Sequence, residues 1–375
     1  MAGLLHRAGC KVSVITCGDP ERDNTREGLR IKRIRSPNIY WNYQPHSGTV
    51  KKLVWHFKEN VNPTARSRIK EVLADFGPDV VVTSTIENFG AEAWVAPHEA
   101  NIPCVHIIRS YYPFCWEGNA VRNGRNCDGA CLDCAVLSWG RKRASKHVSG
   151  VVGISDYALK RHLQQGLFPT ARTVLIPEPI SESAFVPRDD PMPMGRFGYL
   201  GVLSPDKGLE TLAAAWRRVG VSQASLAVAG RGGELYTEKL KGMFSADVRF
   251  EGWVDSARFI ATIDFLIVPS VWNEPFGRII IEAFAQGVPV IGSQIAGIGE
   301  TVRNSKNGFT FTPGSVEELA RLIRRCAAIT PEDYRVLSRQ ASLDVKAYGS
   351  SLVCAAHIAF YDQVIRNFRA SKSQR

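Results

Sequence analysis

The sequence predicts an α/β protein of two domains, each with a parallel sheet covered by helices on both faces. Short apolar runs of strand length alternate along the whole chain with longer segments of helical periodicity, which is typical of parallel sheets. At 375 residues the chain is long enough to bury two separate cores. A proline-rich stretch over 177–193 suits a hinge, so we place the domains at 1–178 and 179–349.

In the first half the pattern begins with a helix over 1–7 that leads directly into a strand. The further strands are expected at 80–84, 103–108, 150–154 and 173–176, after the first at 11–16. Helices are expected between them, at 64–76, 89–98 and 156–165.

The second half repeats the alternation more regularly. Its strands are expected at 197–201, 225–229, 264–268, 288–292 and 309–311. Its helices are expected at 208–219, 234–244, 276–286 and 316–329, and a last helix at about 350–368. The sequence shows no internal repeat and no low-complexity segment.

Composition excludes several classes of protein. Hydrophobic residues make up 45% and charged residues 22%, as in an ordinary globular domain, and no apolar run reaches the length of a bilayer span. The start of the chain lacks the pattern of a secretory signal, so we expect a cytoplasmic protein whose nine cysteines are reduced or metal-bound.

Much of the net charge of +11 lies in the first half. Residues 1–180 hold 24 Lys and Arg against 16 Asp and Glu, a difference of +8. This excess fits either a solvated basic surface or contact with anionic lipid, centred on Lys51-Lys52 before Trp55 and Phe57 and on residues 141–143 after Trp139. We expect no nucleic-acid partner, because no known binding module accompanies the charge.

The most informative segment runs from 270 to 287 and contains two carboxylates, Glu274 and Glu282, with seven residues between them. Because a residue before proline avoids helical geometry, Glu274 is expected in a strand-to-helix loop and Glu282 about two turns inside the following helix. The first free N–H groups of that helix are expected at Phe276 and Gly277. Carboxylates that accept from hydroxyl groups, beside amides that bind an anion, suit a phosphorylated sugar ligand.

This segment resembles the retaining GT-B glycosyltransferases of family 4, in its Glu-x7-Glu frame followed by Gly-Val-Pro-Val-Ile at 287–291. The resemblance continues at 295–300 and 307–308, and extends back through 199–212 and 226–230, so it covers most of 195–312 in the expected order. It implies two Rossmann-like domains facing each other across a cleft. It also implies that the last helix, about 350–375, crosses back to the first domain.

The resemblance assigns roles to particular residues. Lys207, in a turn before a helix, is implied to hold the donor diphosphate as negative charge grows on it. Glu274 is implied to face the transferred sugar and Glu282 the ribose hydroxyls. Arg109, which departs from the family, is a candidate to contact the sugar or an acceptor phosphate. The remaining residues implied at the donor site are Gly201, Gly230, Trp253, Phe276, Gly277 and Glu300. For Glu300 a helix-start carboxylate without a ligand is an equal alternative.

Three departures from the family pattern stand out. The opening strand and its Gly-rich turn are missing from the first domain, which favours an N-terminally truncated chain. Val202 stands where the family has arginine, so Arg231 or Arg278 is a candidate to supply that charge. Arg109 stands where the family commonly has a histidine, and arginine cannot act as a general base.

Four cysteines lie within 20 residues of the first half, at Cys115, Cys127, Cys131 and Cys134. Their spacing of x11, x3 and x2 among Gly, Asn and Asp residues predicts a small structural zinc site. Reduced, partly buried thiols are the alternative.

Taken together, the residues and the resemblance predict a hexosyltransferase. It would move a sugar from a UDP- or GDP-linked donor to a glycan or lipid-linked acceptor, with no cofactor required for the chemistry. Bacterial surface polysaccharide or glycolipid synthesis, at the inner face of the plasma membrane, is the expected setting. Two rivals remain: an inactive relative that binds nucleotide-sugar or glycan as a partner subunit, and an enzyme that hydrolyses or epimerises a nucleotide-sugar.

Overall fold

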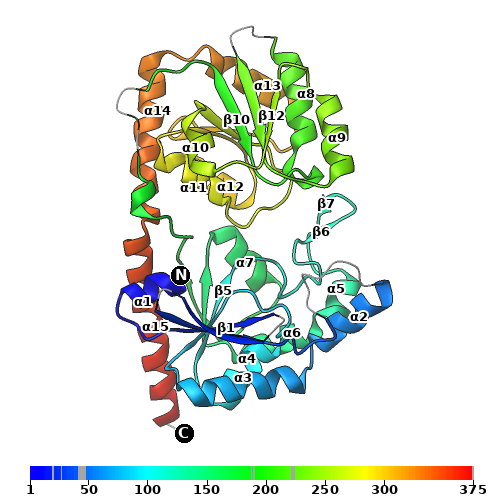
Figure 1. Ribbon diagram of the computed structural model, residues 1–375, viewed down its shortest axis with the longest axis vertical. Helices are drawn as coiled ribbons and strands as arrows, with labels where there is room; N and C mark the ends of the chain where they lie inside the picture. Colours follow the sequence, from blue (N-terminus) through cyan, green and yellow to red (C-terminus); the bar gives the residue numbers. More distant parts are fainter. Residues whose placement is uncertain are drawn as a thin grey trace. The chain divides into compact units, whose positions relative to one another are not determined.

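The computed structural model describes residues 1–18, 21–26, 28–40, 48–186, 188, 191–220 and 224–373 (Figure 1). The chain divides into two compact units, which are described separately below. Unit 1 comprises Met1–Ala120, Cys127–Pro177 and Ser351–Arg375, and unit 2 comprises Val121–Asn126 and Glu178–Ser350. Both units are α/β with predominantly parallel strands, as the sequence predicts. Part of the proline-rich stretch, including Pro187, lies outside the described residues.

Unit 1 contains two sheets. The first has the order β1-β3-β2, with β1 parallel to β3 and β2 antiparallel to it, and the second has the order β4-β5-β8-β9, all parallel. The strands of unit 1 are β1 (Ser13–Cys17), β2 (Arg22–Arg26), β3 (Leu29–Ile34), β4 (Val81–Thr83), β5 (Cys104–Ile108), β8 (Gly150–Gly153) and β9 (Arg172–Leu175). The β2–β3 hairpin was not predicted: β2 contains no apolar residue, although β3 alternates apolar and basic residues over 29–32.

The helices of unit 1 follow the expected alternation and add three that were not predicted, α2, α5 and α6. They are α1 (Ala2–Arg7), α2 (Thr49–Lys58), α3 (Pro63–Phe76), α4 (Glu92–Glu99), α5 (Leu132–Leu137), α6 (Trp139–Ala144), α7 (Asp156–Gln164) and α15 (Ser350–Ser373). Helix α15 closes the unit, because Val364 and Phe360 pack directly against Gly150 of β8. Among the described residues, no helix is both long enough and apolar enough to cross a membrane.

Unit 2 is built on one six-stranded parallel sheet in the order β12-β11-β10-β13-β14-β15. These strands are β10 (Arg196–Leu200), β11 (Ser225–Ala229), β12 (Arg249–Gly252), β13 (Phe265–Val268), β14 (Val290–Ser293) and β15 (Gly308–Phe311). A small hairpin of β6 (Val121–Arg122) and β7 (Arg125–Asn126) belongs to the same unit. The central strands are almost wholly apolar and buried, as expected for a sheet covered on both faces.

The helices of unit 2 cover the sheet with a continuous apolar core that includes Trp216, Phe265 and Ile323. They are α8 (Leu209–Val219), α9 (Glu234–Met243), α10 (Ser256–Ala261), α11 (Arg278–Ala285), α12 (Ala296–Thr301), α13 (Val316–Ala327) and α14 (Pro331–Asp344). Helix α11 begins later than predicted, at Arg278. Gly277 before it has φ 86°, which interrupts any helical turn through Pro275 and Phe276.

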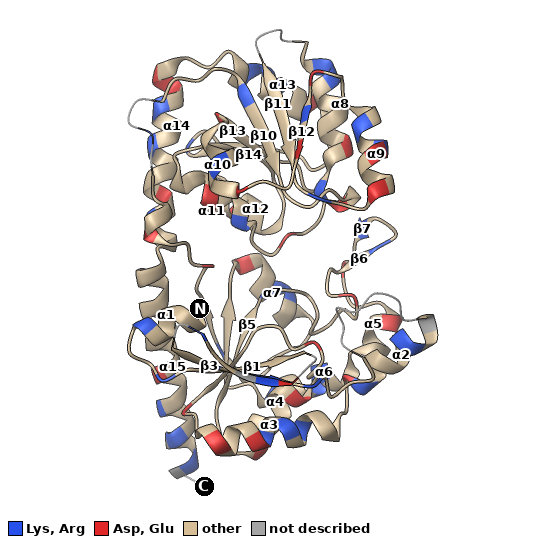
Figure 2. Cartoon of the chain, viewed as in Figure 1, with Lys and Arg blue, Asp and Glu red and all other residues tan. Residues whose placement is uncertain are grey.

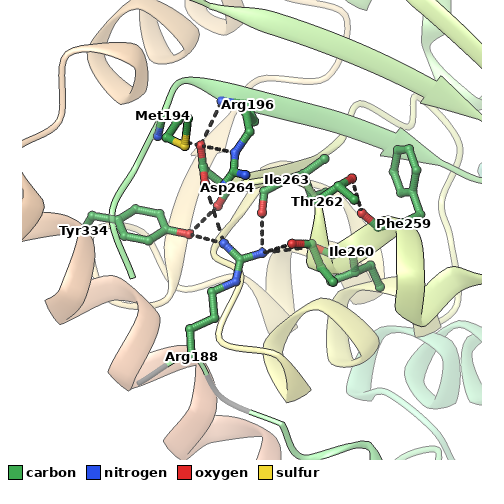
Figure 3. Close-up of polar contacts among 10 residues, drawn as sticks. Arg188, Met194, Arg196, Phe259, Ile260, Thr262, Ile263, Asp264 and Tyr334 are labelled. Carbon is green, nitrogen blue, oxygen red and sulfur yellow. Dashed lines mark hydrogen bonds and ion pairs between the residues drawn. The ribbon is translucent and has the colours of Figure 1, made fainter. Parts of the chain in front are cut away.

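The amino ends of β10 and β13 are joined through one buried carboxylate, Asp264 (Figure 3). Its Oδ2 accepts from the backbone N–H of Met194 at 2.8 Å and of Arg196 at 2.9 Å. Its Oδ1 accepts from Arg196 Nη2 at 2.7 Å, and Arg188 lies 3.6 Å away. Tyr334 Oη donates to the backbone carbonyl of Asp264 at 2.9 Å. This Asp264 cluster fixes the two strands side by side.

Candidate functional site

The strand order of unit 2 determines where a ligand site is expected. The chain runs from β10 outward to β11 and β12, and then returns to the other side of β10 as β13. In open parallel sheets, ligands bind beyond the carboxyl ends of the strands at the point where the order reverses. In unit 2 that point lies between β10 and β13. The loops that follow these two strands carry Lys207 and Glu274.

The loop after β10 is held tightly against the loop after β13. Gly208 has φ 71°, and a Cβ at this position would lie 1.8 Å from the carbonyl oxygen of Pro269, so the turn requires glycine. The carbonyl of Asp206 accepts from the backbone N–H of Val271 at 3.0 Å and of Trp272 at 3.2 Å. The two loops therefore form one rigid edge, and Lys207 projects from it.

Lys207 and Glu274 meet at this edge. Lys207 Nζ donates to Glu274 Oε1 at 3.0 Å, and it lies 4.7 Å from the centre of the Trp272 ring. Their side chains are 18% and 20% exposed, so both are sheltered and still reachable from solvent. The backbone carbonyl of Glu274 accepts from the N–H of Gly297, at the start of α12, at 3.0 Å. The backbone of Glu274 is thus held by the start of α12, and its carboxylate by the lysine.

Glu282 lies near the same edge but is placed differently from the prediction. It is the fifth residue of α11, about one turn inside the helix, because the helix starts at Arg278. Its Oε1 accepts from Arg278 Nε at 3.1 Å. The Phe276 side chain is buried and its ring lies 5.9 Å from the ring of Tyr348, so this side chain packs in the core. Because α11 starts at Arg278, Phe276 and Gly277 precede the helix and are not its first residues.

The loops after β10 and β11 lie side by side. Gly230 has φ 139°, and a Cβ there would lie 1.7 Å from the carbonyl oxygen of Gly201, so these two glycines define the closest approach. The N–H of Leu203 donates to the carbonyl of Arg231 at 2.8 Å, which brings Arg231 next to the exposed Val202. The guanidinium of Arg231 lies 5.9 Å from the centre of the exposed Trp253 ring.

Two further predicted residues lie on elements other than the two loops that carry Lys207 and Glu274. Glu300 is exposed and is the fifth residue of α12, so it is not a carboxylate at the start of that helix. Arg109 is exposed directly after β5 and belongs to unit 1. Its charge contributes to the lowered pKa of His357, about 4, of which burial is the main cause.

The four cysteines of the predicted zinc site lie in unit 1. A hydrogen bond from the Cys134 thiol lowers the pKa of Cys115 to about 6 against the effect of burial, and Cys131 contacts Cys134 in turn. Among the described residues, however, no group of three or more His, Cys, Asp or Glu side chains is arranged to hold a metal ion. The zinc site is not tested by this arrangement and stays a prediction.

Three residues of the site were not predicted. The backbone carbonyl of Asp206 ties the loop of Lys207 to the loop after β13, and the Trp272 ring lies against the lysine ammonium. Both stand beside predicted residues in the sequence, and Trp272 was visible within the 270–287 segment. Asn126 of the β6–β7 hairpin donates to the carbonyl of Val271 at 2.8 Å and accepts from the N–H of Asn273 at 2.9 Å. No sequence signal relates it to residues about 145 positions away.

The sequence matches known protein families in both halves. Residues 195–328 match the family described as glycosyl transferases group 1, and residues 1–179 match the glycosyl transferase 4-like domain. Together these matches support a group 1 glycosyltransferase with the GT-B fold. The first match contains Lys207, Glu274 and Glu282, so the edge described above lies in the part of the chain that matches the glycosyl transferases group 1 family.

Similar curated proteins are more distant over the full length. A protein of the Klebsiella pneumoniae cps region, whose function is uncharacterised, is 22% identical over 307 residues, which is 81% of each chain. The phosphatidyl-myo-inositol mannosyltransferase of Mycobacterium leprae is 24% identical over 85% of this chain and 81% of its own. The lipopolysaccharide core glycosyltransferase LpsE of Rhizobium meliloti is 32% identical, over 47% of this chain and 50% of its own.

Solved structures of similar fold cover nearly the whole glycosyltransferase. A sucrose-phosphate synthase from Thermosynechococcus elongatus matches with a TM-score of 0.75 at 21% identity, over 98% of this chain and 92% of its own. The Anabaena protein HepE in complex with UDP matches with a TM-score of 0.70 at 18% identity, over 90% of this chain and 87% of its own. At this identity they establish the two-domain GT-B fold.

Proposed function

We propose that this glycosyltransferase transfers a hexose from a UDP- or GDP-linked donor to a glycan or lipid-linked acceptor, with retention of configuration at the sugar. The observation that carries the proposal is the Lys207–Glu274 pair at the reversal point of the unit 2 sheet. A cation and a carboxylate side by side suit a ligand that combines a diphosphate with sugar hydroxyls. Both charges are sheltered, which strengthens their interaction with a ligand.

Lys207 is the residue proposed to stabilise the leaving diphosphate. It projects from an edge that is tied by the backbone of Asp206, so little reorganisation is needed when charge develops. Arg231 is proposed to supply the charge that Val202 lacks, because its loop pairs with Leu203 directly beside Val202. Arg278 is the weaker candidate, since its guanidinium already contacts Glu282.

Glu274 is proposed to accept hydrogen bonds from the transferred sugar and Glu282 from the ribose. Because both carboxylates are proposed to bind the donor, neither is left to act as the nucleophile of a double displacement. We therefore propose a front-face reaction in which the donor phosphate takes the proton of the acceptor hydroxyl. Arg109 is proposed to bind the sugar or an acceptor phosphate, since its guanidinium keeps its proton.

The setting is proposed from the relatives. HepE was solved with UDP and with UDP-glucose, which supports a nucleotide-sugar donor. LpsE acts in lipopolysaccharide core synthesis and the M. leprae relative on phosphatidyl-myo-inositol, and these names support a glycan or lipid-linked acceptor. We propose that the protein works at the cytoplasmic face of the plasma membrane of a bacterium, in surface polysaccharide or glycolipid synthesis.

The first test is thermal unfolding with UDP, GDP, ADP and their common sugar conjugates. A ligand at 100 times its Kd stabilises the folded state by about 2.7 kcal/mol, which raises Tm measurably. A shift with uridine or guanosine nucleotides, lost in Glu282→Ala and kept in Glu332→Ala, is expected. Glu332 is a matched control because it lies exposed on α14. An absence of any shift would refute a formed donor site.

A second measurement separates the active enzyme from an inactive binding relative. The exposed Val202, at a position where the family has arginine, is the observation that favours the inactive relative. Incubation with the selected donor and candidate acceptors should release the nucleotide and give a product whose anomeric configuration, read by NMR, equals that of the donor. Binding of the nucleotide without turnover of any acceptor would favour the partner subunit, and an inverted product would exclude retention.

The structural zinc site is retained as a separate proposal, independent of the transfer reaction. The thiol contacts among Cys115, Cys131 and Cys134 bring three of the four expected ligands into one loop region. Metal analysis of protein purified without chelator is expected to give close to one equivalent of zinc. Less than about a tenth of an equivalent would exclude the site.

A further inference from the structure

Helix α2 of unit 1 exposes an apolar stripe to solvent. Val50, Leu53, Val54 and Phe57 follow the i, i+3, i+4, i+7 spacing that places side chains on one face of a helix. That spacing normally marks the face buried against a core. Here all four side chains are exposed, Val50 to 74% and Phe57 to 62%.

The opposite face of α2 is the buried one, and polar contacts hold it. Trp55 is 1% exposed and Glu59, the residue after the helix, is fully buried. Glu59 accepts from Asn38 Nδ2 at 2.6 Å and from Tyr112 Oη at 2.9 Å. Asn60 accepts from the N–H of Gly140 at 2.8 Å. Because these contacts determine which face turns inward, the exposed stripe does not result from a loosely packed helix.

The apolar surface continues onto the neighbouring helices. Helix α5, which packs against α2, exposes Leu132 to 84% and also exposes Val136, one turn later on the same face. Trp139, the first residue of α6, is exposed as well. We call this surface the α2–α5 face, and it comprises Val50, Leu53, Val54, Phe57, Leu132, Val136 and Trp139. Single exposed apolar residues are ordinary, but seven on α2, α5 and α6 are not.

The charged residues of α2 are all basic. Lys51 and Lys52 are exposed and Lys58 is half-buried, and the helix contains no acidic residue (Figure 2). Lys52 stacks over Trp116 at 4.5 Å and lies 3.9 Å from the exposed Glu117. Lys142 and Arg143 add exposed positive charge on α6, while Asp133 is the acidic residue of α5. An apolar stripe beside lysines is typical of helices that lie in the interface of an anionic bilayer.

We propose that the α2–α5 face docks on an anionic membrane surface, with its apolar side chains in the headgroup region and the lysines among lipid phosphates. The exposed lysines beside the apolar stripe complement the negative charge of anionic headgroups, which favours a bilayer as the occupant. An exposed tryptophan is also typical of residues at the headgroup level. The lysines attract anionic lipid and the apolar stripe then anchors the helix.

The structure changes the sequence-based interpretation of this surface. Trp55 and Arg141, which the sequence places among the membrane contacts, are both buried. Arg141 stacks on the ring of Tyr112 at 4.0 Å. The proposed membrane contacts lie instead on the exposed stripe of α2 and on α5. The docking adds to the proposed function and rests on it, because it would serve to bring the enzyme to lipid-linked acceptors.

The test is sedimentation of the full chain with phosphatidylcholine vesicles, with and without phosphatidylglycerol. Binding to the anionic vesicles is expected, weakened by salt, with little binding to the neutral ones. Leu53→Asp and Phe57→Asp should each weaken binding about tenfold or more, because each places a charge in the apolar stripe. Leu235→Asp is the matched control, since Leu235 is exposed on α9 of unit 2. An unchanged Tm in all three variants establishes that they fold.

Three results would overturn the proposal. One is wild-type protein that stays in the supernatant with anionic vesicles at low salt, and another is binding that both stripe variants keep in full. The third is a concentration-dependent dimer that Phe57→Asp dissociates, which would make the face a protein interface. The nucleotide thermal shift, run in parallel, separates the two proposals. Vesicle binding without a shift refutes only the donor site, and a shift without vesicle binding refutes only the docking.

Discussion

Strands β10 and β13 carry a carboxylate and its cations at each end, and the two ends differ in how completely the carboxylate is satisfied. At the amino ends, Asp264 is fully buried and accepts from two backbone N–H groups and the guanidinium of Arg196 (Figure 3). At the carboxyl ends, Glu274 accepts from Lys207, and both side chains stay about one fifth exposed. The same pair of strands therefore has a saturated end and an open end.

If the open end binds the donor, as proposed, one sheet separates stability from function. A buried carboxylate is tolerated only when its hydrogen bonds are filled, so the Asp264 cluster has no capacity left for a ligand. Lys207 contacts one carboxylate and one aromatic face, which leaves an ammonium able to meet a phosphate. The Asp264 cluster fixes the strands at their amino ends. Lys207 and Glu274 at the carboxyl ends are therefore held in place and can still contact a ligand.

The largest effect on stability is expected from Asp264→Ala. Removing the carboxylate leaves the N–H groups and the guanidinium of Arg196 without their acceptor, which typically costs about 3–5 kcal/mol. Urea unfolding measures the change as a lower midpoint at constant slope. Glu332→Ala, at an exposed pair on α14, is the control and should stay within about 0.5 kcal/mol. An Asp264 variant as stable as this control would contradict the assigned role.

The next effect concerns activity. Lys207→Ala should reduce kcat/KM by about 10²–10³-fold, or roughly 2.7–4 kcal/mol of transition-state stabilisation, while the free energy of unfolding changes by less than about 1 kcal/mol. The assay uses the nucleotide-sugar selected by thermal shift. Lys241→Ala removes an exposed lysine of α9 and should leave turnover unchanged. Equal loss in both variants would mean that general charge, and not this position, matters.

The smallest effect is expected from Tyr334→Phe, which removes one hydroxyl from the saturated end. The hydroxyl donates to the carbonyl of Asp264 at 2.9 Å within a buried environment. Losing it should cost about 0.5–1.5 kcal/mol of stability and leave the nucleotide thermal shift intact. Calorimetry in the presence and absence of nucleotide measures both. A weakened nucleotide response would show that the two ends are coupled.

Much of unit 2 could be predicted from the sequence, because its strands are buried on both faces and its loops follow a family frame. That frame assigned Lys207 and Glu274 to one donor site, and the structure brings the two side chains into contact. The frame failed at the start of α11, since the left-handed backbone of Gly277 is a property of the folded loop and proline alone suggested an earlier start. Glu300 was misplaced for a related reason, because α12 starts before it at Ala296.

Features that depend on distant partners could not be predicted. The sequence predicts Asp264 only as the first residue of a strand. Nothing in it indicates that the partner of this carboxylate is Arg196, 68 residues earlier. The stripe of α2 has the spacing of a core-facing helix, yet it faces solvent because Glu59 and Asn60 bind residues from elsewhere in unit 1. Periodicity identifies the faces of a helix, but long-range contacts decide which of them turns inward.

The return of α15 to unit 1 has a consequence for synthesis on the ribosome. Every residue of unit 2 has been synthesised when the ribosome reaches Ser350, whereas unit 1 also needs Ser351–Arg375. Until then Gly150 of β8 lacks the cover of Phe360 and Val364. Domains usually complete in chain order, but here the later unit is complete first. A chain that ended at residue 350 would thus contain every residue of unit 2 but an incomplete unit 1, in which Gly150 lacks the cover of α15.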